Sequence, residues 1–493
     1  ILALTFTNKA ANEMKERIQG MIGKTKAKQL WMGTFHSIFA KILRSEAAKL
    51  NYRANFSIYD KEDSVSLTGN VLQELNISID DKSSSAIHHQ ISSLKNRMIL
   101  ADEYAKHHAE TASEKKFAQV YIEYNKRLFE NNSMDFDDLL LKPIELFNNN
   151  QRILQKYKKQ FKYILIDEFQ DTNKAQYEII KMCATGRTKV CAVGDDAQSI
   201  YGWRGAELTN ILNYEKDFDK TKVFRLEQNY RSTQTILKAA DSVIAKNDKQ
   251  IKKTLWTENA EGEKISILRC SDEKDEAYRI SKQIKKEISS KKLSLNDVSI
   301  LYRINSQSRA LEEALRREKI PYKIIGGVEF YKRKEIKDII GYLRVLANQN
   351  DEESLLRIMN FPQRGIGNTS ISKMIAFSRK LDLSLFTTMS RVFEVIEVKE
   401  RIQKNVKQFK QLLDKYSELK DKLSLTELVG ALIDELGILK MYKEENSAES
   451  KQRYENVQEL LSGIAEFASS NPKATIDDFL SEDSLIAGID QYD

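Results

Sequence analysis

The stretch YILIDEFQDTN, residues 163–173, sets a short apolar run directly against two adjacent carboxylates, Asp167 and Glu168. Such runs are typical of central strands in parallel sheets, whose carboxyl ends form the crevice where doubly wound folds bind nucleotides. An aspartate there can hold Mg²⁺ on a triphosphate, and a glutamate beside it can activate the attacking water. The cation would also relieve the repulsion between the two charges. From this stretch alone, a pair that merely caps the next helix remains an equal alternative.

Other segments of the first half continue this pattern. Residues 1–8, 30–50 and 189–195 each begin as an apolar strand and lead into polar residues or an amphipathic helix, and a further strand is expected at 223–230. The intervening residues 51–130 are polar and helical in pattern. We therefore expect an α/β fold, with buried parallel strands covered by helices on both faces and a helical insertion.

A second α/β unit is expected downstream. Its strands are predicted at 298–303 and 322–327, on either side of a helix at 306–319 for which Ser306 is a plausible N-cap. From about residue 346 the pattern is helical to the end of the sequence.

Composition limits the class of protein. At 493 residues and 41% hydrophobic, the chain can bury several cores. The net charge of +7 permits a polyanionic partner without demonstrating one. Three scattered cysteines favour a reducing, cytoplasmic compartment over a disulfide framework. No run of 18 apolar residues is present, which argues against membrane spanning.

A second polar constellation follows the strand at 189–195. Within ten residues it presents Asp195, Gln198, Tyr201, Trp203 and Arg204. The two aromatic rings would suit stacking of unpaired bases, and the arginine could reach phosphate. Aromatic residues that only fill a core between helices are the competing interpretation.

Two further loops have features that suit phosphate. In LEQNYRST, Tyr230 and Arg231 pair an aromatic plane for a purine with a guanidinium for a phosphate oxygen. In RGIG, Gly365 and Gly367 would let backbone amides approach phosphate at a helix N-terminus. Taken alone the first is weak, and the second is equally consistent with a plain interhelical turn.

Taken in order and spacing, these motifs resemble those of the UvrD/Rep/PcrA family of superfamily-one DNA helicases. The resemblance covers nearly the whole chain and rests on the motifs TFTNKAANEMKER, TFHSI, MDFDDLL, IDEFQDTN, VGDDAQSIYGWRGA, LEQNYRST, LYRINSQSRALEEALRREKIPY and PQRGIGNTSI. It implies an ATP-dependent 3′–5′ DNA helicase and single-stranded DNA translocase of DNA repair or replication.

The resemblance also implies a domain plan with two RecA-like parallel-sheet domains, each carrying a helical insertion. The corresponding segments are residues 1–50 and 131–228 for the first RecA-like domain, 51–130 for its insertion, 229–345 for the second RecA-like domain and 346–493 for its insertion.

For the ATP site the family pattern assigns five residues. Asp167 would coordinate Mg²⁺, Glu168 would activate water, and Gln198 would sense the γ-phosphate. Tyr230 would stack on adenine, and Arg231 would reach the γ-phosphate.

The expected partners are single-stranded DNA and junctions between single and double strands. The residues that the family pattern places on DNA are Phe6, Asn8, His36, Phe136, Tyr201, Trp203, Arg204, Arg303, Asn305, Gly365 and Gly367.

One family motif is missing from the sequence. A phosphate loop reads GxxxxGK followed by Ser or Thr, whereas GMIGKT at 20–25 has Ile18 where the first glycine should be and follows a helix pattern. We therefore expect an internal fragment of a longer helicase, without the phosphate loop and the C-terminal motifs, that binds DNA without ATP turnover. The alternatives are a non-catalytic single-stranded DNA-binding module and the motor part of a RecB/AddA-like helicase-nuclease.

Overall fold

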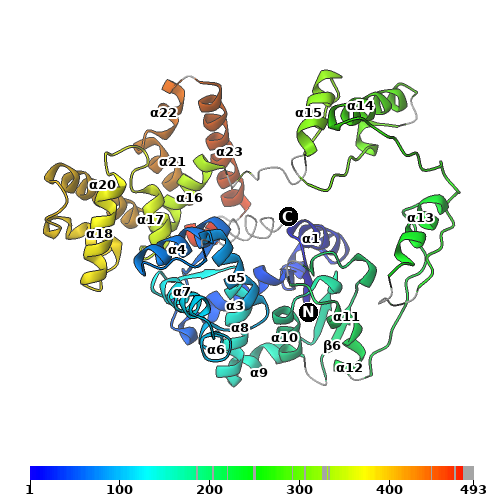
Figure 1. Ribbon diagram of the computed structural model, residues 1–493, viewed down its shortest axis with the longest axis horizontal. Helices are drawn as coiled ribbons and strands as arrows, with labels where there is room; N and C mark the ends of the chain where they lie inside the picture. Colours follow the sequence, from blue (N-terminus) through cyan, green and yellow to red (C-terminus); the bar gives the residue numbers. More distant parts are fainter. Residues whose placement is uncertain are drawn as a thin grey trace. The chain divides into compact units, whose positions relative to one another are not determined.

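The computed structural model describes residues 1–480 except 81, 185–186, 203–204, 219, 248–250, 252, 291–292, 305–306, 325–329, 331–332, 446 and 471–473. The chain forms two compact units (Figure 1). The first joins Ile1–Asp217 to Phe330–Tyr492, and the second is Phe218–Glu329.

The first unit contains a four-stranded parallel sheet. Its strand order is β2 (Trp31–Thr34), β1 (Leu2–Thr5), β5 (Tyr163–Ile166) and β6 (Lys189–Ala192). Leu4 of β1 pairs with Gly33 on one side and with Ile166 on the other. The predicted α/β fold with parallel strands is therefore confirmed.

Helices begin where β1 and β2 end, because a threonine caps each of them. The Thr7 hydroxyl accepts from the Ala10 amide at the start of α1 (Asn8–Ile22), and the Thr34 hydroxyl accepts from Ser37 at the start of α3 (Phe35–Glu46). Helix α1, which is followed by the short α2 (Lys24–Ala27), packs on both strands.

The expectation that both faces of the central strands are covered is wrong for β5. Ile164 and Ile166 are buried, whereas Tyr163 is 50% exposed and Leu165 is 42% exposed. Successive side chains of a strand point to opposite faces, so one face of the sheet at β5 lacks cover within the described part of the first unit.

The segment predicted as a helical insertion is helical, and it also contains a short strand. After the short η1 (Ala47–Leu50), its elements are β3 (Ser57–Tyr59), α4 (Lys61–Glu74), α5 (Ser84–Asn96), α6 (Ala101–His107) and α7 (Ala112–Glu130). Strand β3 pairs in parallel with β4 (Ser133–Asp135), so the insertion begins and ends at neighbouring strands. The chain then returns to the sheet through α8 (Asp138–Asn149), α9 (Gln151–Gln160) and, after β5, α10 (Lys174–Cys183).

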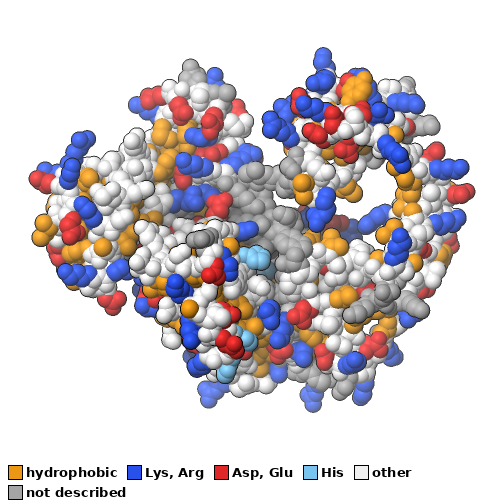
Figure 2. Space-filling model, in the orientation of Figure 1, with side chains coloured by type: hydrophobic (Ala, Val, Ile, Leu, Met, Phe, Trp, Pro, Cys, Tyr) orange, Lys and Arg blue, Asp and Glu red, His pale blue; other side chains and the backbone are white. Residues whose placement is uncertain are grey.

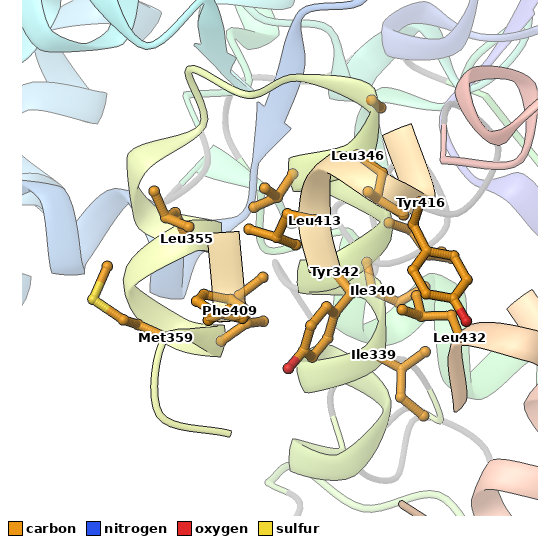
Figure 3. Packing of buried hydrophobic residues seen from close by; sticks show 14 of the residues in the cluster. Ile339, Ile340, Tyr342, Leu346, Leu355, Met359, Phe409, Leu413, Tyr416 and Leu432 are labelled. Atoms are coloured by element: carbon orange, nitrogen blue, oxygen red, sulfur yellow. The ribbon is translucent and has the colours of Figure 1, made fainter. Parts of the chain in front are cut away.

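The C-terminal part of the first unit is helical in its described residues, as its pattern predicted. Its helices are α16 (Lys334–Ala347), α17 (Glu352–Ile358), α18 (Asn368–Lys380), α19 (Leu385–Ser390), η8 (Val392–Glu394), α20 (Glu400–Leu419), α21 (Leu425–Glu435), α22 (Ile438–Glu445) and α23 (Ala448–Ser470). They share one apolar core, in which Tyr342 and Phe409 meet edge to face with ring centroids 6.2 Å apart (Figure 3).

Buried ion pairs join these helices to the insertion. Lys337 and Arg344 of α16 lie 2.6 Å from Asp60 and Asp63 at the start of α4. The Tyr59 hydroxyl donates to Asp351 over 3.0 Å. The contact therefore combines complementary charge with hydrogen bonds, the arrangement that buried charges require.

The second unit contains helices α13 (Gln234–Ile244), α14 (Glu273–Ser289) and α15 (Ser308–Arg317) and the short η5 (Leu295–Asp297). The strands predicted at 223–230 and 298–303 are absent from its described residues, and 322–327 lies partly outside them, as does Ser306. Phe224 is 81% exposed and Leu301 is 91% exposed. An apolar run adopts strand structure only when a neighbouring strand supplies hydrogen bonds. Among the described residues of this unit, one isolated bridge occurs, and it joins Gln228 to Trp256.

Among the described residues, no helix combines the length and apolar character needed to cross a bilayer. On the face shown in Figure 2, basic and acidic side chains are interspersed, consistent with the small net charge of +7.

Candidate active site and nucleic-acid interface

The carboxyl ends of the four parallel strands bring several of the predicted residues of the first unit to one edge of the sheet. Phe6 follows β1, His36 follows β2, Asp167 follows β5 and Asp195 follows β6. Their convergence results from the parallel order of the strands, which places every strand's carboxyl end on the same side.

Asp167 is fixed by its backbone and presents its carboxylate to solvent. Its amide donates to the Leu4 carbonyl of β1 over 2.9 Å, which extends the sheet by one residue. Partial desolvation, with a smaller contribution from Glu168, raises the pKa of Asp167 above its ordinary value. Among the described residues no basic side chain pairs with Asp167. A bound cation would supply that missing charge.

Glu168 adopts a left-handed backbone conformation, with φ of +49°. It precedes the 3-10 turn η2 (Phe169–Asp171), in which the Phe169 amide donates to Val193 over 2.9 Å. The Phe169 ring is fully buried between Tyr177 and Tyr214. This anchor holds the chain in a conformation that a glutamate would otherwise disfavour, and it turns the carboxylate away from the core.

Gln170 is a residue of this site that the sequence analysis missed. Its side-chain Nε2 donates to Glu168 Oε2 over 2.9 Å, and its Oε1 accepts from the Asp195 amide over 2.9 Å. Gln170 is 1% exposed. Its position two residues after Glu168 is the one signal in the sequence that could have indicated it.

Gln198 lies on the same loop as Asp195, in the turn η3 (Asp196–Gln198). Its Nε2 donates to Asp195 Oδ2 over 2.9 Å, and its side chain is exposed. Through Asp195 and Gln170, Gln198 is thus connected to Glu168, although the two residues lie on different strand ends.

The aromatic residues of the predicted DNA surface form two pairs. Phe6 stacks on Tyr201, with ring centroids 5.2 Å apart and an angle of 29° between the rings. Both side chains are half-buried, so part of this stack is open to solvent. Trp203 and Arg204, predicted as its neighbours, lie outside the described residues.

The second pair, His36 and Phe136, is more enclosed. The ring centroids are 5.3 Å apart, and Phe136 is 4% exposed, so in this conformation it presents little surface for a base. Burial lowers the pKa of His36 to about 4, which keeps the imidazole neutral near pH 7.

The motif MDFDDLL has a structural role that the sequence analysis did not anticipate. Lys95 of α5 lies between Asp135 and Asp138, with its Nζ 2.6 Å and 2.9 Å from their carboxylates. Asn96 donates to Asp137 over 2.9 Å and accepts from Asn173 over 2.9 Å. These bonds hold the loop around Phe136 against the insertion and the start of α10.

Three predicted residues belong to the second unit. Tyr230 is 77% exposed, and the Arg231 amide donates to the Asn229 side chain over 2.9 Å, which fixes the turn on which both residues stand. Arg303 is exposed and its amide donates to Gln307. Asn305 lies outside the described residues. Nucleotide and DNA contacts for these residues stay predictions.

The two glycines of RGIG lie in a turn before α18. Gly365 has φ of +71°, and the Asn360 side chain accepts from the Arg364 and Ile366 amides on either side of it. Gly367 occupies the N-cap of α18 without a side-chain cap. Asn8, the remaining predicted DNA contact, is the half-buried first residue of α1.

The edge of the sheet fits a nucleotide-bound Mg²⁺ better than a metal cage made only of protein. No cluster of three ligating side chains occurs among the described residues. Mg²⁺ in nucleotide sites takes most ligands from phosphate and water, so one carboxylate such as Asp167 suffices. In addition, the Thr5 hydroxyl at the end of β1 is buried without a hydrogen-bond partner in the described part of the chain. It therefore remains available to a polar ligand.

The stretch GMIGKT lies at the end of α1 and the start of α2, with Gly23 at φ of +84° between them. A phosphate loop instead connects a strand to a helix. The structure thus agrees with the prediction that this stretch is not a phosphate loop.

Two family models match the chain. The UvrD/REP helicase N-terminal domain matches residues 1–219, and the UvrD-like helicase C-terminal domain matches residues 224–492. This coverage does not support the expectation that family motifs are missing from the chain.

Curated relatives agree with the family models. The chain is 42% identical over 493 residues to a protein of Bacillus subtilis (strain 168) named ATP-dependent DNA helicase PcrA, and covers 66% of it. Proteins of the same name in Staphylococcus aureus (strain Mu50) and Staphylococcus epidermidis are 40% identical, and the chain covers 67% of each. Each match covers the whole of this chain and about two thirds of the relative's length. It belongs to the UvrD/REP helicase family.

Proposed function

We propose that the protein is an ATP-dependent DNA helicase that translocates along single-stranded DNA in the 3′–5′ direction and acts at junctions of single and double strands. One observation carries the proposal: the carboxylates Asp167 and Glu168 and the stacked rings Phe6 and Tyr201 follow strands of one parallel sheet, at the same edge. The names of the relatives support the same activity. A cytoplasmic location and a role in DNA repair or replication belong to the proposal.

In this mechanism each residue has one task. Asp167 would hold Mg²⁺, which supplies the positive charge that the transferred phosphoryl group requires. Glu168 orients a water molecule and accepts its proton, and Gln198 contacts the γ-phosphate. Phe6 and Tyr201 stack on unpaired bases, which binds single strands without sequence preference.

The test is ATP hydrolysis measured with and without single-stranded DNA. We expect stimulation by DNA, loss of activity on removal of Mg²⁺ with EDTA, and a fall in kcat of roughly 10²- to 10⁴-fold in Glu168→Gln. Glu178→Gln, on α10, is the matched control and should hydrolyse ATP normally. Undiminished turnover in Glu168→Gln would remove this glutamate from the mechanism. Strands labelled at the 5′ or the 3′ end report the direction of translocation.

A second candidate is a protein that binds single-stranded DNA without hydrolysis. It is favoured by one feature of the sequence, which contains no GxxxxGK followed by Ser or Thr. Fluorescence anisotropy with a labelled oligonucleotide separates the candidates. Tight DNA binding without DNA-stimulated hydrolysis would favour this second function.

A further inference from the structure

We propose that Gln170 is the positioning residue that orients the Glu168 carboxylate and connects it to the loop 193–201, which carries Gln198 and Tyr201. This inference rests on the proposed function, because it assigns Gln170 a role in the hydrolysis attributed to Glu168.

The side chain of Gln170 uses both ends of its amide for this connection. Nε2 donates to Glu168 Oε2 over 2.9 Å and to Asp171 Oδ2 over 3.2 Å, while Oε1 accepts from the Asp195 amide over 2.9 Å. Only an amide side chain combines a donor and an acceptor at this separation. A carboxylate in its place would keep the bond to Asp195 and lose the bond to Glu168.

The loop passes unusually close to this amide. A Cβ at Gly194 would lie 2.7 Å from Gln170 Oε1 and 3.1 Å from Ile211 Cδ1 of α11 (Leu208–Leu212). The φ angle of Gly194 is not in the left-handed region, so the glycine is needed for space and not for conformation. The close approach holds the Asp195 amide within reach of Gln170.

Both ends of the loop are tied to residue 170. The Ser199 hydroxyl donates to the Gln170 carbonyl over 3.3 Å, and Gln198 donates to Asp195 over 2.9 Å. Tyr201, two residues after Ser199, stacks on Phe6. A shift of this loop when a base displaces or extends the stack therefore reaches the Glu168 carboxylate through the buried amide of Gln170.

A merely structural glutamine provides the matched control. Gln176 is 3% exposed, and its Oε1 accepts from the Asn173 amide in the capping box of α10, away from Glu168. Gln176→Ala should lower stability as much as a change at Gln170 does, without altering the ratio of hydrolysis with DNA to hydrolysis without it.

The first experiment measures steady-state ATP hydrolysis of Gln170→Glu and Gln170→Ala. We expect kcat in saturating single-stranded DNA to fall roughly 10-fold or more in both, because a general base that is misoriented loses most of its effect. The KM for ATP and the Kd for DNA should change less than about twofold, since neither ligand contacts this buried amide. A loss of folding would instead lower activity and both affinities together.

The second experiment does not depend on activity. Hydrogen exchange of the peptide covering residues 193–199 should be faster in Gln170→Ala, which loses the acceptor for the Asp195 amide, and unchanged in Gln170→Glu, which keeps it. Gly194→Ala should also be defective in hydrolysis. Combining it with Gln170→Ala should cost less than the sum of the two changes, because the colliding side chain is gone.

Full DNA-stimulated kcat in both Gln170 variants, or exchange at 193–199 that does not respond to Gln170→Ala, would overturn the inference alone. A wild-type protein without DNA-stimulated hydrolysis would overturn the proposed function and the catalytic role of Gln170 together.

Discussion

The Asn96 side chain donates to Asp137 over 2.9 Å, and this partly buried bond joins the end of α5 to the residue after Phe136. Asp137 is buried, and the charges of Asp135, Asp138 and Lys95 act on its carboxylate. The stability of the loop that carries Phe136 thus depends on how these charges balance.

The free energy of unfolding of Asp137→Asn should rise relative to that of the wild type as the pH rises. Burial, with a contribution from Asp135, raises the pKa of Asp137 to about 7, whereas an unfolded aspartate titrates near 4. Between these values the folded protein binds the extra proton, so its stability falls as the pH rises. The variant lacks this loss. Measured by urea unfolding, the difference in unfolding free energy between the variant and the wild type should change by roughly 1 to 3 kcal/mol in favour of the variant from pH 5 to pH 8. An equal difference at both pH values would contradict the raised pKa of Asp137.

Lys95→Met should destabilise the protein strongly. The change leaves two buried carboxylates, Asp135 and Asp138, without their shared cation, which costs about 3 to 5 kcal/mol. Lys126→Met is the control, because Lys126 is 58% exposed and its nearest carboxylate is 3.6 Å away. It should cost about 0 to 1 kcal/mol. Equal denaturant midpoints for the two variants would argue against a structural role of Lys95.

Tyr201→Ala and Phe6→Ala should weaken binding of single-stranded DNA. Loss of one stacked base costs roughly 1 to 3 kcal/mol, which corresponds to an increase in Kd of about 5- to 150-fold. Phe393→Ala, in the C-terminal helices, removes a ring that is 50% exposed and has no predicted role. Anisotropy titrations in which all three variants bind like the wild type would rule out the Phe6–Tyr201 stack as a base platform.

The two glycines of RGIG should respond differently to alanine. Gly365→Ala forces a Cβ into a left-handed conformation and should cost roughly 1 to 2 kcal/mol in thermal or urea unfolding. Gly367 has no atoms within 4 Å of a built Cβ, so Gly367→Ala should leave stability nearly unchanged. If the turn approaches duplex phosphate, Gly367→Ala should nevertheless weaken duplex binding. Unchanged duplex affinity would favour the plain interhelical turn.

The sequence predicted the elements whose signals are local. The apolar runs that end at Asp167 and Asp195 are strands, and the carboxylates stand at their ends as expected. The runs at 223–230 and 298–303 have the same local pattern but no strand pairing in the described residues. Strand formation depends on a neighbour that a single segment does not encode.

The contacts that complete the site are not local. Lys95 meets Asp135 across 40 positions of sequence, and Gln170 meets Asp195 across 25. Neither contact produces a periodic pattern in the sequence, because each depends on how separate elements pack against each other. The family pattern places Phe136 on DNA, whereas the burial of its ring follows from this packing.

The parallel pairing of Ser57–Tyr59 with Ser133–Asp135 has a consequence for how the molecule can be altered. The residues between these two segments leave the first unit's core and return to it at adjacent, paired strands. Loops of the insertion can therefore change in length while the chain's entry and exit points at the sheet stay in place, provided that the contacts of Lys95, Asn96 and Asp63 with the rest of the unit are kept. Natural variation in this part of the chain can then alter the insertion while Phe6, Asp167 and Asp195 keep their places at the carboxyl ends of the strands.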